Sequence, residues 1–157
     1  MELYDGSAFR VERRDDRDVV VHAPVAAILA IDRQEHVTLV RQHRVPVDAT
    51  LLELPAGFLE AGEAPLDGAR RELAEETGLH GGEWVEVATF FSSGGFTDER
   101  VHLFLATGLE SGASSPTEDE DLEVVRVPLA DVPGLLPGLE DAKTLIGLLL
   151  LSRDLHL

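Results

Sequence analysis

Three glutamates fall within five residues of one predicted helix. Glu72 and Glu76 are four residues apart and would share one helical face, with Glu75 at their flank. On an exposed helix, like charges at this spacing repel each other by about 0.2–0.5 kcal/mol per pair. Carboxylate oxygens are the ligands that hard divalent cations take. The cluster is therefore either a solvated acidic face or a set of metal ligands.

A longer pattern surrounds these glutamates and favours the second reading. Gly57 is followed after five residues by Glu63 and after seven more by the run Arg-Glu-Leu-Ala-Glu-Glu-Thr-Gly-Leu at residues 71–79. This pattern resembles the Nudix box, the signature of the Nudix hydrolases, and every specified position is filled. A match at so many fixed positions is far more specific than a lone glycine motif. The resemblance implies metal-dependent cleavage of a diphosphate.

Composition sets limits on the class of protein. The chain has 157 residues, of which 44% are hydrophobic, and a formal net charge of −17. We expect one domain, and we expect neither nucleic acid nor an anionic membrane surface as a partner, because both require basic patches. No cysteine is present, the first residues lack the pattern of a signal peptide, and no apolar run approaches the length of a membrane span. A cytoplasmic protein is expected.

The pattern of apolar residues and turn residues predicts one α+β domain over residues 1–157. Strands are predicted over residues 8–13, 18–22, 24–31, 36–41, 51–54, 84–91, 101–107 and 122–127. The apolar run at 24–31 predicts a strand buried on both faces. A helix is predicted to begin at Pro65 and to end at Gly78, which can adopt the left-handed conformation. A short helical turn is expected at 129–132, a second helix at 140–155, and loops at 92–98 and 108–121.

The resemblance extends beyond the box to the ADP-ribose pyrophosphatase group of this superfamily. Residues 41–44 (RQHR) with residues 52–57 (LELPAG) resemble one segment of that group. Residues 93–99 (SGGFTDE) resemble another, although a glycine stands where the group usually has proline, and residues 141–145 (DAKTL) resemble the start of its last helix. The implied fold is an α/β/α sandwich with a mixed central sheet and an N-terminal β-hairpin.

The box assigns roles around the metal. By resemblance, Glu72, Glu76 and the backbone carbonyl of Ala56 would hold Mg²⁺, with Mn²⁺ as the alternative ion. Arg71 is expected to bind a glutamate or a loop carbonyl and so stiffen the ligand set. Two roles stay open for Glu75, which would be either a metal ligand or a partner of Arg71.

The resemblance also assigns residues to the substrate. Arg44 would bind the diphosphate, Glu53 would support the site, and Phe96 lies in a loop that would contact the substrate. An ordinary surface arginine is the competing reading of Arg44. The general base of the group lies on a late loop, where Glu118 is the matching position and Glu120 the alternative.

Taken together, the sequence predicts hydrolysis of ADP-ribose to AMP and ribose 5-phosphate with Mg²⁺. One alternative is another nucleoside diphosphate sugar or a dinucleotide as substrate. A different alternative is a non-catalytic module that senses a nucleotide, although such modules usually lose box carboxylates and this chain has kept all of them. The resemblance further implies a homodimer, with residues 1–22 in the dimer contact.

Overall fold

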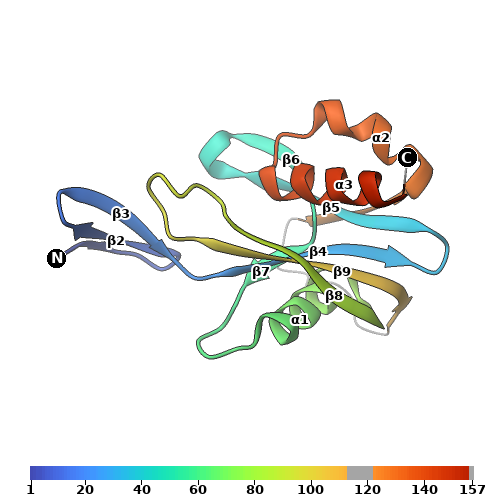
Figure 1. Ribbon diagram of the computed structural model, residues 1–157, viewed down its shortest axis with the longest axis horizontal. Helices are drawn as coiled ribbons and strands as arrows, with labels where there is room; N and C mark the ends of the chain where they lie inside the picture. The colour runs from blue at the N-terminus through green and yellow to red at the C-terminus, as the bar shows by residue number, and fades with distance from the viewer. Residues whose placement is uncertain (113–121, 156–157) are drawn as a thin grey trace.

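The computed structural model describes residues 1–112 and 122–155, and Figure 1 shows how the elements are arranged. The strands are β1 (Glu2–Asp5), β2 (Phe9–Arg14), β3 (Arg17–His22), β4 (Val25–Asp32), β5 (His36–Arg44), β6 (Ala49–Glu53), β7 (Ala56–Phe58), β8 (Leu79–Phe91), β9 (Arg100–Ser111) and β10 (Leu122–Pro128). The α-helices are α1 (Pro65–Thr77), α2 (Val132–Leu135) and α3 (Ala142–Leu155). Short 3-10 turns cover Val45–Val47, Leu129–Asp131 and Leu136–Gly138.

The central sheet is mixed and has seven strands. Its main path runs β10-β5-β4-β9-β8, with β6 added to β5 and β7 added to β4. The neighbours β4 and β9 are parallel, and the other pairs are antiparallel. Helix α1 lies on one face of the sheet, while α2 and α3 lie on the other (Figure 1). The α/β/α sandwich predicted from the sequence is confirmed.

Strand β4 sits between two apolar cores, and all eight of its residues are buried. Ala26, Ile28 and Ala30 face the core beneath α1, while alternate residues such as Leu29 face the core beneath α3. Successive side chains of a strand point to opposite faces of the sheet, so a strand that is covered on both faces contributes alternate residues to each core. The predicted double burial of this segment is correct.

Helix α1 has the boundaries that its sequence predicts. Pro65 occupies the first turn, and Gly78 follows the helix at φ 71° in the left-handed conformation. A Cβ on Gly68 would lie 2.3 Å from Cδ2 of Leu59, so only glycine lets the helix approach that leucine. Ala69 and Leu73 are fully buried beneath the sheet. The helix therefore has one fixed position against the strands.

The N-terminal residues form a separate three-stranded sheet. The predicted hairpin is present as β2 and β3, and β1 adds a strand that sequence patterning did not indicate. This small sheet projects from one end of the sandwich (Figure 1). This sheet contacts the loop before β9, where Thr97 pairs with Val20 in a parallel bridge. The amide of Val20 donates to the Phe96 carbonyl at 2.8 Å.

Several boundaries differ from the prediction. Strand β9 continues to Ser111, so the first residues of the expected loop at 108–121 are strand. Strand β8 begins at Leu79, although Gly81 and Gly82 give that segment the composition of a turn. Both glycines have positive φ, and Gly81 still pairs with Leu109 of β9. Strand β7 was not expected, and the turn predicted at 129–132 continues through Pro133 and Gly134 as α2.

Among the described residues, none of the helices combines the length and the apolar character needed to cross a membrane.

Candidate active site

Arg71 lies at the centre of the acidic cluster on α1. Its Nε and Nη2 atoms donate to the two carboxylate oxygens of Glu63, each at 3.0 Å. Its Nη1 atom donates to Glu72 at 2.7 Å and to Glu75 at 3.2 Å, and Nη2 also reaches the Phe58 carbonyl at 3.0 Å. The two kinds of partner expected of Arg71 were a glutamate and a backbone carbonyl. Arg71 contacts both kinds, namely three glutamates and the Phe58 carbonyl.

The charge of Arg71 stabilises the ionised form of Glu63. Hydrogen bonds from Arg71 lower the pKa of Glu63 from 4.5 to about 2, and the amide of Glu60 adds a further bond at 2.9 Å. The same contacts raise the pKa of Arg71 above its usual value. Glu63 therefore fixes the loop before α1 to the helix. Of the two roles left open for Glu75, the described contacts show the one with Arg71.

The three predicted metal-binding positions lie together. Glu76 is buried, and its Oε2 atom accepts a hydrogen bond of 3.1 Å from the amide of Ala56. An ideal Cβ on Gly57 would lie 2.0 Å from Cδ of Glu72, so the Glu72 carboxylate occupies the space that a side chain would fill. Glu72 and Glu76 are therefore packed against the same short segment, β7, which was not predicted from the sequence.

The donor chemistry of this site suits a hard divalent cation. Two carboxylates and a backbone carbonyl supply only oxygen atoms, which is the ligand type that Mg²⁺ and Mn²⁺ take in proteins. Within residues 1–112 and 122–155, no three acidic or histidine side chains are grouped closely enough to hold a metal by themselves. The Ala56 carbonyl would add a third oxygen to those of Glu72 and Glu76, and the residues present fit the ion.

A second charged pair joins the ends of β5 and β6, just before β7 in the chain. The side chain of Arg44, at the end of β5, donates through Nε and Nη2 to Glu53 at 2.6 and 2.8 Å. This two-point geometry is the strong form of an arginine–carboxylate pair. Glu53 is only 1% exposed, whereas the Arg44 side chain is 42% exposed. Hydrogen bonding to Glu53 raises the pKa of Arg44.

The start of α3 joins this pair, although the sequence analysis assigned no site residue there. Lys143 donates to Glu53 at 3.4 Å and to Asp141 at 2.7 Å. Asp141 also accepts from the amide and hydroxyl of Thr144, at 2.9 and 2.7 Å, and so caps the helix. The Thr144 hydroxyl in turn accepts from the amide of Leu54 at 2.7 Å. The resemblance at residues 141–145 was the signal that could have indicated these contacts.

Phe96, which was assigned to the substrate, lies in the loop before β9. The Phe96 side chain is 57% exposed, in the loop that is attached to β3. Contacts to Asp98 hold this loop: its Oδ1 atom accepts from the amide of His22 at 3.0 Å, and its Oδ2 atom pairs with Arg14 at 3.0 Å. Glu118 and Glu120 lie outside the described residues.

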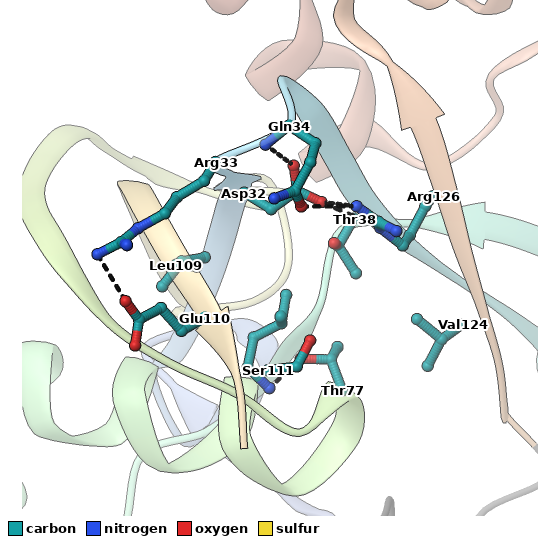
Figure 2. Close-up of a pocket in the computed structure, with 11 residues that line it drawn as sticks. Asp32, Arg33, Gln34, Thr38, Thr77, Leu109, Glu110, Ser111, Val124 and Arg126 are labelled. Carbon is teal, nitrogen blue, oxygen red and sulfur yellow. Dashed lines mark hydrogen bonds and ion pairs between the residues drawn. The ribbon is translucent and has the colours of Figure 1, made fainter.

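A separate cavity of about 330 Å³ lies near the last residues of β4 and β9. Its lining includes Asp32, Thr38, Thr77, Glu110 and Arg126, which come from β4, β5, α1, β9 and β10 (Figure 2). Arg126 is paired with Asp32, and the buried hydroxyl of Thr38 has no hydrogen-bond partner within the described part of the chain. Neither Glu72 nor Glu76 lines this cavity, so it is distinct from the site at β7.

Comparison with known proteins matches these features to one family. The family described as "NUDIX domain" matches residues 21–147. The chain is 39% identical over 148 residues to the ADP-ribose pyrophosphatase of Bacillus subtilis (strain 168), an alignment that covers 92% of this chain and 77% of the relative. It is 32% identical over 145 residues to the GDP-mannose pyrophosphatase of Citrobacter koseri, covering 85% and 75% of the two chains.

A solved structure supports the fold independently. A protein described as an ADP compounds hydrolase superposes with a TM-score of 0.80 at 22% identity. The superposition covers 99% of this chain and 91% of the other. The similarity includes the N-terminal sheet as well as the sandwich, because it extends over nearly the whole chain.

Proposed function

The chain belongs to the NUDIX domain family and is a Nudix pyrophosphohydrolase, and on that premise we propose that it hydrolyses ADP-ribose to AMP and ribose 5-phosphate with Mg²⁺. The observation that carries the proposal is the packing of Glu72 and Glu76 against the segment Ala56–Gly57. The resemblance to an ADP-ribose pyrophosphatase supports the choice of substrate.

In the proposed reaction, water attacks one phosphorus of the diphosphate while the bond from that phosphorus to the bridging oxygen breaks. Glu72, Glu76 and the Ala56 carbonyl would hold Mg²⁺, with Mn²⁺ as a substitute, and the bound ion would neutralise charge on the phosphate oxygens. Arg71 keeps the glutamates in place through the contacts described above. Arg44 contacts the diphosphate, and Glu53 fixes the plane of its guanidinium.

The general base takes a proton from the attacking water. We propose Glu118 for this role, with Glu120 as the alternative. Glu118→Gln should slow turnover more than Glu120→Gln does, because only the base must accept a proton. The measurement is kcat for both variants at saturating substrate, and the reverse order would assign the base to Glu120.

The test of the function is direct. Purified protein is incubated with ADP-ribose and Mg²⁺, and AMP is measured by chromatography. A panel run in parallel with Mg²⁺ and with Mn²⁺ includes GDP-mannose, other nucleoside diphosphate sugars and dinucleotides. GDP-mannose is the second candidate because a relative at 32% identity is a GDP-mannose pyrophosphatase. The substrate with the highest kcat/KM identifies the activity, and a preference for GDP-mannose would replace the ADP-ribose assignment.

A non-catalytic sensor is the competing class of function. It would bind a nucleotide, detected as a shift in melting temperature, and would hydrolyse no member of the panel. The presence of every box carboxylate counts against it.

The glutamate at position 76 gives the sharpest variant. Glu76→Gln should lower kcat by about a thousandfold or more, a loss typical of removing electrostatic stabilisation of a transition state. The fold should persist, since a glutamine oxygen can still accept the hydrogen bond from the Ala56 amide. Asp67→Asn, at an exposed position of the same helix, is the control and should retain activity. A near-normal rate for Glu76→Gln would remove Glu76 from the metal site.

We also propose a cytoplasmic homodimer that acts on small molecules and binds neither nucleic acid nor membrane. The absence of cysteine and the formal charge of −17 are consistent with this setting. The exposed aromatic side chains Tyr4 and Phe9 in the N-terminal sheet support the proposed dimer contact.

A further inference from the structure

We propose that Lys143 is a positioning residue that controls how strongly Arg44 binds the substrate diphosphate. Lys143 would do so by sharing the charge of Glu53, so that the guanidinium of Arg44 keeps a net attraction for an anion. The inference rests on the proposed function, in which Arg44 contacts the diphosphate, and it adds a role for the first turn of α3.

The charges around Glu53 carry the first step. Glu53 is buried and contacts two cations, Arg44 through both of its carboxylate oxygens and Lys143 through Oε2. With Asp141 included, two positive and two negative groups form a cluster of net charge zero. Without Lys143, two carboxylates would remain beside one guanidinium. The cluster would then carry one net negative charge next to the position proposed for a negatively charged diphosphate.

The contacts of Asp141 carry the second step, because they fix where the lysine charge lies. Asp141 is held by the amide and the hydroxyl of Thr144, so its carboxylate has a set direction. Burial by itself would raise the pKa of Asp141, but the charge and hydrogen bond of Lys143 act together with the two hydrogen bonds from Thr144, and the pKa is lowered. The Lys143 side chain is only 19% exposed and lies between two fixed carboxylates.

The residue type carries the third step. Lys143 is the only lysine in the chain, and the other twelve basic residues are arginines. An arginine at this position would offer a planar fork that competes with Arg44 for both oxygens of Glu53. A lysine is a compact charge that needs one contact, and it leaves the two-point pair between Arg44 and Glu53 intact.

The kinetic test uses single and double variants with ADP-ribose and Mg²⁺. Lys143→Met should raise KM about tenfold and leave kcat within about twofold of wild type, since one well-placed charge corresponds to a factor of this order. Lys143→Arg should lie between Lys143→Met and wild type, because it keeps the charge and loses the compact contact. Arg33→Met removes one positive charge near the far end of β4 and is the control, with KM expected to be unchanged.

The double variant separates positioning from direct contact. If Lys143 acts through Arg44, Arg44→Gln with Lys143→Met should show no larger KM than Arg44→Gln alone. Effects on KM that multiply would mean that Lys143 contacts the substrate by itself, and the inference would be wrong. An unchanged KM for Lys143→Met in a protein of normal melting temperature would reduce Lys143 to a structural role and would also overturn the inference.

A binding measurement with inorganic pyrophosphate separates this inference from the proposed function. Reductive ¹³C-methylation labels the single lysine while keeping its charge, and its resonance should shift when pyrophosphate binds. By calorimetry, Lys143→Met should weaken pyrophosphate binding about tenfold. If wild-type protein binds pyrophosphate in this Lys143-dependent way but hydrolyses no ADP-ribose, only the substrate assignment fails. Equal pyrophosphate binding by wild type and Lys143→Met refutes the inference and leaves the proposed function standing. If wild type binds neither pyrophosphate nor ADP-ribose, the inference and the proposed function are both wrong.

Discussion

At the scale of single residues, Arg71 organises the box. An i,i+4 spacing places Glu72 and Glu76 on one face, and the residue before Glu72 would ordinarily point away from it. The long side chain of Arg71 instead folds back to Glu72 and also reaches Glu63 and the Phe58 carbonyl. One cation therefore offsets the repulsion among the crowded carboxylates and joins the loop to the helix.

The contact between Arg71 and Glu63 predicts a defined response to acid. The pKa of Glu63 is lowered in the folded protein from 4.5 to about 2, so its stabilising contribution is complete above pH 4.5. That contribution should decline as the pH falls from 4.5 to 2. Melting temperatures of wild type and Glu63→Gln should therefore differ at pH 6 and converge across that interval. A difference that has already vanished at pH 4.5 would contradict this prediction.

At the scale of elements, β7 is the piece that makes the site. It has only three residues, yet it pairs with the fully buried β4 and contacts Glu72 and Glu76 of α1. The chain on its other side is fixed by the start of α3, where the Thr144 hydroxyl accepts from the amide of Leu54. The segment Leu54–Phe58 is thus held between the two helical layers of the sandwich.

Gly57→Ala should damage activity more than stability. The new Cβ would lie 2.0 to 2.4 Å from the carboxylate atoms of Glu72, which is the mobile end of a long side chain. Glu72 can move aside with little loss of stability, but it then leaves the position proposed for binding metal. We expect kcat to fall at least tenfold, with a melting temperature within a few degrees of wild type. Gly138→Ala, where a Cβ meets nothing, is the control; normal activity in Gly57→Ala would argue against the proposed role of Glu72.

Thr144→Val should destabilise the protein. It removes the partner of the buried Leu54 amide and one donor to Asp141. An unsatisfied buried group costs about 1–3 kcal/mol, and urea unfolding should show a loss of this size in the free energy of unfolding. Thr144→Ser keeps the hydroxyl and is the matched control. An equal loss in both variants would contradict the role assigned to the hydroxyl, because Thr144→Ser keeps that group.

At the scale of the whole molecule, the N-terminal sheet contacts the sandwich through the loop before β9 and through the rings of His22 and Phe58. The loop at 92–99 pairs with β3 through Val20, and Asp98 binds the His22 amide and Arg14. That loop also carries Phe96, which the sequence assigned to substrate binding. The position of the N-terminal sheet and the shape of the proposed substrate site are therefore linked through this loop.

The proposed dimer predicts a mass of two chains in solution. Tyr4 and Phe9 lie 5.9 Å apart between ring centroids and are largely exposed, as expected of residues that a second chain would cover. Tyr4→Arg should shift the protein toward monomer in light scattering. Leu149→Arg, at an exposed position of α3, should leave the mass unchanged. A monomeric wild type, or a dimer indifferent to Tyr4→Arg, would exclude this contact.

The sequence by itself determined the elements whose signals are local. Pro65, Gly78 and the apolar spacing of α1 lie within a few turns of each other, and the burial of β4 on both faces follows from one continuous apolar run. The shared face of Glu72 and Glu76 followed for the same reason, because it depends on the helical repeat alone. The reaction class followed from the resemblance of the whole pattern to the Nudix box.

Only the tertiary structure decided which distant segments meet. Lys143 and Glu53 are 90 positions apart, as are Thr144 and Leu54, and no repeat in the sequence relates them. Strand β7 is too short and too rich in glycine to be recognised by composition, and it forms because β4 offers unpaired backbone groups beside it. Contacts of this kind depend on how the layers pack, and packing is settled by the whole chain at once.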